Sequence, residues 1–317
     1  MKITLITPAN KYSKSGNRTS AARWARLLRE QGHKVHIKVE YNGQPTDLLI
    51  ALHAWRSAGA INMYRENYPQ APLIVALGGT DVNTYLASDP IVTQGSMDKA
   101  DILICLHDQI KCRLPKRFQK KLFTIKQSAV PLSVPRKPSI RNFDICVVGH
   151  LREEKDPFRA AFAARLMPEC SRLRIIHLGK AHTSQWAKLG KAEMANNLRY
   201  IWKGEVPSWR VRQEYARTHL MVISSNQEGG ANVVSEAIMA GVPIIASHIP
   251  GNTGLLGPDY PGYYPVNDEF ELAKLLEHAE THPKFLRELY LHGRRLRKDF
   301  LPNKEAAEWR RIIKMIT

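Results

Sequence analysis

The sequence predicts an α/β protein with two similar halves, each a parallel sheet covered by helices. Three observations support this prediction. Short apolar runs alternate with helix-compatible segments along the chain, which is typical of βαβ units. The alternation is interrupted by a stretch rich in proline and basic residues, 130–142, and then begins again. The chain length of 317 residues suits two domains of about 150 residues each.

The first half is expected to cover residues 1–135. Its helix Thr19–Gln31 is followed by Gly32, a typical helix stop. Its predicted strands are short apolar runs: Ile3–Thr7, Lys34–Val39, Asp47–Leu52, Leu73–Leu77, Asp101–Leu106 and Lys121–Ile125. Ligands in sheets of this kind bind beyond the carboxyl ends of the strands, so the loops that follow these runs are the first place to look for a site.

The second half, residues 136–302, repeats the pattern. Helices are expected at Pro283–Lys298 and Asn303–Ile316, near the end of the chain. The predicted strands are Phe143–Gly149, Arg172–Leu178, Leu198–Trp202, Leu220–Ser224 and Pro243–Ala246. Two such Rossmann-like halves predict a ligand site in the cleft between them.

Composition narrows the class of protein. Hydrophobic residues make up 44% of the chain, which supports full cores, and no stretch approaches the roughly 20 apolar residues of a membrane span. The segment Met1–Thr7 is too short and too strand-like for a signal peptide, so a cytoplasmic protein is expected. The four cysteines lack metal-ligand spacing. We therefore expect reduced thiols, no metal and no cofactor.

The net charge of +18 is unevenly distributed. Between Gln109 and Phe143 there are ten basic residues and no acidic one. A solvated basic surface is the favoured interpretation, and attraction of anionic substrates, a membrane surface or nucleic acid are alternatives. No nucleic-acid motif accompanies the charge, so nucleic acid is not expected as a partner, and peripheral membrane contact is not favoured.

The most informative motif joins two glutamates, Glu228 and Glu236, which stand eight positions apart after the buried run Leu220–Ser224. The spacing predicts Glu228 in a loop and Glu236 in the following helix. Backbone N–H groups at that helix start suit a phosphate, and a carboxylate accepts the two hydrogen bonds of a vicinal diol. These groups predict a nucleotide-sugar site, to which the intervening residues also contribute: Gly229, Gly230, Ala231, Asn232 and Val233. An ordinary glycine turn with exposed glutamates is the alternative.

A second set of candidates follows the first strand of the second half, in the loop 149–155. It contains Gly149, His150, Arg152 and Lys155. Two cations suit an anionic leaving group, because paired positive charges stabilise its developing charge. The alternative is a basic surface loop in which Glu153 pairs with Lys155.

Three loops of the first half carry further candidates. Gly16, Asn17 and Arg18 open the first helix, where free N–H groups suit an anion, or where Asn17 or Thr19 simply caps the helix. The other two loops follow strands and contain His53 with Arg56, and Thr80 with Asp81. A lone histidine is more often structural than catalytic, and the Gly78–Asp81 segment suits a turn.

Glu228 and Glu236, with Ala237 and Gly241-Val-Pro243 after them, resemble the signature of family-4 glycosyltransferases of the GT-B fold. The resemblance implies that Glu228 contacts the donor sugar and Glu236 the ribose, and that Arg152 and Lys155 grip the diphosphate. His150 stands where that family usually has arginine. The loop with Gly204 and Glu205 would meet the nucleobase, which family habit makes uridine, and the helix 303–317 would pack back on the first domain.

A narrower resemblance covers nearly the whole chain. The segments Ser15–Arg18, His53–Ser57, Leu77–Asp81 and Gly149–Pro157, in this order, resemble the selenosugar synthases of bacterial selenoneine biosynthesis. The resemblance implies transfer of a sugar from UDP-N-acetylglucosamine or UDP-glucose to selenophosphate, giving a 1-selenosugar. His53, Arg152, Lys155 and Glu228 are the expected catalytic residues, and the three loops of the first half would bind the acceptor.

Two alternatives stay open. The same enzyme class could act on a carbohydrate, a lipid or a sugar phosphate at a membrane face, which the basic segment 109–143 motivates, and the candidate acceptor residues also suit a phosphorylated sugar. A non-catalytic nucleic-acid-binding protein rests on the net charge alone and leaves Glu228 and Glu236 without a role.

Overall fold

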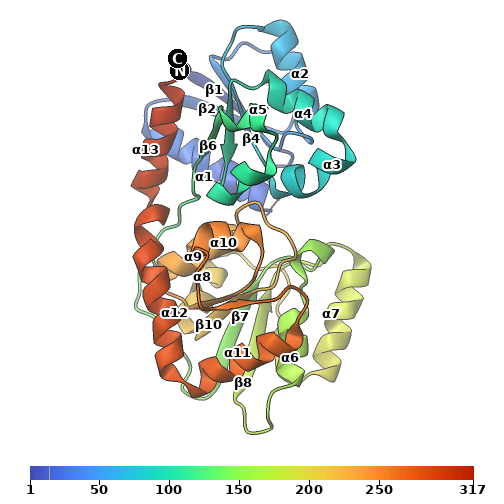
Figure 1. Cartoon of the computed structure of the whole chain (residues 1–317), viewed down its shortest axis with the longest axis vertical. Coiled ribbons are helices and arrows are strands. Elements are labelled where there is room, and N and C mark those ends of the chain that lie inside the picture. The colour runs from blue at the N-terminus through green and yellow to red at the C-terminus, as the bar shows by residue number, and fades with distance from the viewer. Residues whose placement is uncertain (14) are drawn as a thin grey trace. The chain divides into compact units, whose positions relative to one another are not determined.

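The computed structural model describes residues 1–13 and 15–317, which form two compact units. Unit 1 consists of Met1–Ser128, Gly229–Ala231 and Leu301–Thr317. Unit 2 consists of Ala129–Glu228 and Asn232–Phe300. Each unit contains one six-stranded parallel sheet with helices on both faces (Figure 1). In the described part of the chain, no helix is long and apolar enough to cross a membrane.

In unit 1 the strand order is β2-β1-β3-β4-β5-β6. The strands are β1 Lys2–Ile6, β2 Lys34–Lys38, β3 Leu48–Leu52, β4 Leu73–Ala76, β5 Ile102–Cys105 and β6 Leu122–Thr124. The helices are α1 Gly16–Glu30, α2 Ala58–Asn67, α3 Leu86–Ser88, α4 Pro90–Lys99, α5 Lys116–Gln119 and α13 Pro302–Ile313, with a π turn at Asp81–Tyr85 and a 3₁₀ turn at Asp108–Arg113. The chain passes from one side of β1 to the other after β2, which places the topological switch point between β1 and β3.

The two faces of this sheet pack against different helices because side chains alternate along each strand. On one face Leu5 and Ile50 pack against α1 and α13, where Trp24 and Trp309 meet edge to face with ring centroids 4.9 Å apart. On the other face Leu49 and Ala51 pack against α2, α4 and α5.

Helix α1 begins three residues before the predicted Thr19. Ser15 caps it, because the Ser15 hydroxyl accepts a hydrogen bond from the Arg18 N–H at 3.5 Å, so neither Asn17 nor Thr19 is the capping residue. The predicted Gly16–Arg18 loop is therefore the first turn of the helix.

Helix α13 is attached to α1 through a buried carboxylate. Glu305, 1% exposed, accepts hydrogen bonds from Arg23 Nε at 3.1 Å, Trp24 Nε1 at 2.8 Å and the Ser128 N–H at 2.8 Å. Charge-assisted hydrogen bonds of this kind compensate the cost of burying the carboxylate.

In unit 2 the strand order is β9-β8-β7-β10-β11-β12, which corresponds to the 3-2-1-4-5-6 order of a Rossmann sheet. The strands are β7 Phe143–Val148, β8 Leu173–Leu178, β9 Tyr200–Trp202, β10 Leu220–Ile223, β11 Ile244–Ser247 and β12 Tyr263–Tyr264. The helices are α6 Arg159–Arg165, α7 Ser184–Asn196, α8 Ser208–Arg217, α9 Asn232–Ala240, α10 Pro250–Leu256, α11 Glu269–Thr281 and α12 Pro283–Leu296, with 3₁₀ turns at Glu153–Lys155 and Arg297–Phe300. The two-residue strand β12 has no apolar run long enough to predict it.

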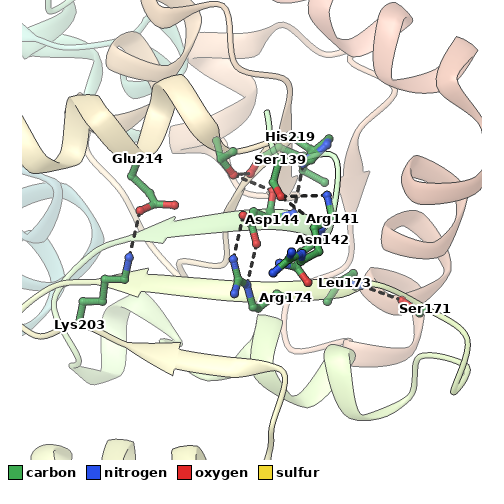
Figure 2. Close-up of polar contacts among 12 residues, drawn as sticks. Ser139, Arg141, Asn142, Asp144, Ser171, Leu173, Arg174, Lys203, Glu214 and His219 are labelled. Carbon is green, nitrogen blue, oxygen red and sulfur yellow. Dashed lines mark hydrogen bonds and ion pairs between the residues drawn. The ribbon is translucent and has the colours of Figure 1, made fainter. Parts of the chain in front are cut away.

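Polar contacts link β7 and β8 near the amino ends of these strands (Figure 2). Arg174 binds the buried Asp144 through two bonds, Nε to Oδ1 at 2.8 Å and Nη2 to Oδ2 at 3.1 Å. The Asp144 N–H donates to His219 Nδ1 at 3.2 Å. These contacts occupy the amino end of the sheet, so the carboxyl end is where ligand-binding groups are to be sought.

Candidate functional site

The switch point of unit 2 lies between β7 and β10, because the strand order reverses there. A small pocket opens at the carboxyl ends of these two strands. Its lining includes Gly149, His150, Lys155, His177 and Ser225. Three of the predicted site residues therefore lie at one pocket, in the position where sheets of this order bind ligands.

Lys155 and Glu228 form an ion pair at this edge of the sheet. The side chains of Lys155 and Glu228 are only 19% and 10% exposed. Ser225 Oγ donates to Glu228 Oε1 at 2.6 Å, which fixes the carboxylate from the end of β10. The alternative predicted pairing of Lys155 with Glu153 is not the one found. A cation and a carboxylate held together here supply one group for a phosphate and one for a sugar hydroxyl.

The backbone around this pair is shaped by close contacts. Ser224 Oγ donates to the carbonyl oxygens of Lys155 and Asp156, at 3.1 and 2.8 Å. Asp156 itself has a left-handed conformation, with φ at 40°. A Cβ atom on Gly251 would lie 2.6 Å from the Glu228 carbonyl oxygen, so glycine is required beside Glu228. The Lys155 and Glu228 side chains are thus positioned by rigid neighbours.

Arg152 and His150 flank the pair. Arg152 Nε lies 3.7 Å from Glu154 Oε2, and the Arg152 side chain is 35% exposed. His150 Nδ1 accepts a hydrogen bond from the Lys180 N–H at 3.1 Å. Burial, and secondarily the Arg152 charge, lowers the pKa of His150. His150 is therefore favoured in its neutral form, and Arg152 and Lys155 are the cations of this loop.

Glu236 lies in the middle of α9, inside the helix as the motif predicts. Tyr215 donates its hydroxyl to Glu236 Oε2 at 3.3 Å, and burial raises the pKa of Tyr215 well above its usual value. Tyr215 stays protonated and orients the carboxylate. Helix α9 begins at Asn232, so Gly229, Gly230 and Ala231 precede it rather than form its first turn. Gly204 and the exposed Glu205 follow β9.

His177, on β8, is a pocket residue that the sequence interpretation missed. Its imidazole is fully buried, and it contacts the Gly149 carbonyl oxygen through Nε2 at 3.0 Å and the Tyr200 hydroxyl through Nδ1 at 2.9 Å. A histidine in the middle of an apolar strand carries no sequence signal by itself. The glycines that follow β7 and β8, Gly149 and Gly179, were the available hint of a close approach there.

In unit 1 the structure brings His53, Thr80 and Asp81 together at the carboxyl ends of β3 and β4. His53 is 3% exposed and Asp81 is 1% exposed. His53 Nδ1 lies 2.6 Å from Asp81 Oδ1, and Nε2 lies 2.7 Å from Thr80 Oγ1. Nδ1 also accepts a hydrogen bond from the Arg56 N–H at 3.3 Å, so both ring nitrogens of His53 have partners and the carboxylate lies against the ring.

Asp81 also organises the loop around His53. The carboxylate accepts hydrogen bonds from the N–H groups of Ala54 at 2.8 Å, Trp55 at 3.0 Å and Gly78 at 2.7 Å. These bonds stabilise the positive φ of His53, 78°, which is unusual for a residue with a side chain. Both Asp81 oxygens are thus engaged inside unit 1, and its position is that of a group that orients His53.

The two candidate acceptor-binding arginines, Arg18 and Arg56, differ in exposure. Arg56 is exposed and follows His53 in the same loop, whereas Arg18 is half-buried in the first turn of α1 beside Gly16 and Asn17. No acidic residue occupies the first turn of α1, so the positive end of its dipole is not neutralised locally. Within residues 1–13 and 15–317 there is no cluster of three or more histidine, cysteine or acidic side chains that could hold a metal.

Comparison with known proteins identifies the class. Residues 136–295 match the family model of group 1 glycosyl transferases, and the chain belongs to this family. The Bacillus subtilis (strain 168) protein named "Putative teichuronic acid biosynthesis glycosyltransferase TuaC" is 24% identical over 258 residues. That match includes 74% of this chain and 61% of TuaC, so the aligned region is less than two thirds of the relative's length.

Solved structures show the same fold. HepE of Anabaena in complex with UDP and glucose superimposes with a TM-score of 0.80 at 14% identity, over 99% of both chains. Sucrose-phosphate synthase of Thermosynechococcus elongatus gives a TM-score of 0.83 at 17% identity, over 99% of this chain and 98% of that one. The chain therefore has the GT-B fold of these structures, which confirms the predicted fold class.

Proposed function

We propose that the protein transfers a sugar from a UDP-sugar, with unit 2 binding the donor. The observation that carries this proposal is the Lys155–Glu228 pair, fixed by Ser225 at the switch point of a Rossmann sheet. Structures of the similarly folded HepE contain UDP, UDP with glucose, or UDP-glucose, which supports uridine as the nucleoside.

Each group has a chemical role in this proposal. Arg152 and Lys155 stabilise the charge that develops on the UDP leaving group as the glycosidic bond breaks, assisted by the N–H group of Asn232 at the start of α9. Glu228 binds a hydroxyl of the transferred sugar. Glu236, oriented by Tyr215, binds the ribose diol. Before the donor binds, Glu228 neutralises Lys155, so donor binding must redirect the ammonium group toward the phosphates.

Selenophosphate is the proposed acceptor, and unit 1 is proposed to bind it. A small phosphate-bearing anion needs cations and N–H donors but no long groove. Arg18, Arg56 and the N–H groups of Gly16 and Asn17 supply such donors. An anionic selenium nucleophile needs little deprotonation when it attacks the anomeric carbon and the bond from that carbon to UDP breaks, so this step requires few further groups. The support for selenium itself is the whole-chain resemblance to selenosugar synthases.

A second acceptor class is favoured by one observation, the pairing of His53 with Asp81. A histidine oriented by a carboxylate is arranged to accept a proton, and a hydroxyl acceptor has a proton to lose. The name of TuaC also refers to teichuronic acid biosynthesis. A carbohydrate or sugar-phosphate acceptor is therefore the alternative to selenophosphate.

UDP release tests the proposal. The wild-type protein is incubated with UDP-N-acetylglucosamine or UDP-glucose, and with selenophosphate, phosphate, simple sugars or sugar phosphates in turn. We expect UDP release above the hydrolysis background with selenophosphate. Release only with carbohydrate acceptors overturns the selenium assignment, and no release together with no UDP binding overturns the donor assignment.

A further inference from the structure

The peptide between Gly149 and His150 is held in one orientation by β8. His177 Nε2 lies 3.0 Å from the Gly149 carbonyl oxygen, which only accepts hydrogen bonds, so Nε2 carries the proton. His177 Nδ1 then accepts from the Tyr200 hydroxyl at 2.9 Å. Burial lowers the pKa of His177 to about 4 and raises the pKa of Tyr200, so both groups stay neutral near pH 7.

The backbone on either side confirms this orientation. The Leu151 N–H donates to the Lys180 carbonyl oxygen at 2.9 Å, and the Leu151 carbonyl accepts from the His182 N–H at 3.0 Å. A Cβ atom on Gly179 would lie 1.8 Å from the Gly149 oxygen, so only glycine permits this approach. Residues 149 and 151 therefore both direct their backbone groups toward the extension of β8.

The N–H of His150 must point the other way. In a trans peptide the C=O and N–H groups are antiparallel, and no cis peptide occurs in the described chain. With the Gly149 carbonyl directed at His177, the His150 N–H is directed toward the β10 side of β7. Among residues 1–13 and 15–317 this N–H has no hydrogen-bond acceptor. Lys155 and Ser225 line the same pocket.

We propose that His177 is a positioning residue that turns the His150 N–H toward the pocket, where this N–H binds the diphosphate of the nucleotide sugar. The inference rests on the proposed function for the identity of the anion. A backbone N–H fixed before the ligand arrives stabilises a phosphate oxygen without reorganisation, in the manner of an oxyanion-hole donor. The cations of the loop then act on a diphosphate whose position is already set.

Variants of His177 test the inference by titration calorimetry with UDP and with uridine, which lacks the phosphates. His177→Phe removes the donor to Gly149 while keeping a ring of similar size. We expect the Kd for UDP to rise about tenfold to a hundredfold, as for the loss of a hydrogen bond to a charged group, and the Kd for uridine to stay unchanged. His177→Gln, whose amide nitrogen donates, should restore part of the UDP affinity.

Ile176→Ala is the matched control, since Ile176 is a buried core residue of the same strand. It should destabilise the fold without changing the ratio of the UDP and uridine constants. A folded His177→Phe variant with the wild-type ratio overturns the inference.

A measurement on the wild-type protein avoids any dependence on variant folding. UDP and inorganic pyrophosphate should each shift the His150 amide proton downfield in ¹H–¹⁵N spectra. UDP binding without this shift overturns the role of His150 and leaves the donor assignment intact. A shift with pyrophosphate, in a protein that turns over no UDP-sugar, overturns the proposed function and supports the anion site. Binding of neither ligand overturns both.

Discussion

The Lys155–Glu228 ion pair leads to a quantitative prediction about unit 2. Removing one partner of a buried pair typically costs 3–5 kcal/mol, whereas an exposed pair contributes about 0–1 kcal/mol. The two side chains are 19% and 10% exposed, which is nearer the buried limit. We expect Lys155→Met and Glu228→Gln each to lower the free energy of unfolding by about 2–3 kcal/mol. The double variant should lose little more, because neither charge is then left unpaired.

The coupling energy from this double-mutant cycle is therefore expected to be about 2 kcal/mol, measured by urea unfolding of the four proteins. Lys203 and Glu214 provide the matched control in the same unit (Figure 2). Lys203 Nζ and Glu214 Oε2 are 3.4 Å apart, and the Lys203 side chain is 46% exposed, so the control coupling should be about 0.5 kcal/mol or less. Equal couplings for the two pairs would refute the view that Lys155 and Glu228 are rigidly paired.

Four further predictions follow from the structure. Glu236→Gln should keep the fold and weaken UDP binding in calorimetry, and equal affinity would remove Glu236 from the ribose site. Arg56→Ala should raise KM for selenophosphate and not for the UDP-sugar, whereas the reverse pattern in steady-state kinetics would assign this loop to the donor. Glu305→Ala should lower the free energy of unfolding by about 3–5 kcal/mol, because Arg23 is left buried without its carboxylate, and a smaller loss in urea unfolding would contradict that account. Burial lowers the pKa of His177 from 6.5 to about 4, so the unfolded state binds one more proton than the folded state as pH falls through this range. The free energy of unfolding should therefore decline by about 3 kcal/mol between these pH values, and His177→Gln should show a correspondingly flatter pH dependence of unfolding.

The sequence predicted the positions of the strands along the chain better than their order in the sheets. Apolar runs such as Leu48–Leu52 are fully buried, so hydrophobic patterning located them directly. The reversal between β7 and β10 has no such signal, because all these strands are parallel and similar in composition. It is the reversal that brings Lys155 and Glu228 together, although 72 positions intervene between them.

For the candidate site, the sequence identified charged side chains and missed the groups that orient them. In the sequence, Asp81 is a candidate turn residue to which several roles can be given. Only the folded structure shows that its carboxylate lies against the His53 imidazole. Tyr215 and His177 lie in an ordinary helix and an ordinary strand, so their contacts with Glu236 and Gly149 depend on long-range packing. Orienting groups of this kind carry no local motif, and only tertiary structure identifies them.

The most direct test of the account is the product formed by the wild-type protein from UDP-N-acetylglucosamine or UDP-glucose and selenophosphate. Mass spectrometry and ⁷⁷Se NMR of the reaction should reveal one sugar joined to selenium at its anomeric carbon for each UDP released, and Lys155→Ala should slow its formation by about tenfold to a thousandfold. Sugar transfer to a carbohydrate, with selenophosphate unchanged, would contradict the acceptor assignment, and wild-type rates in the Lys155 variant would contradict the donor site.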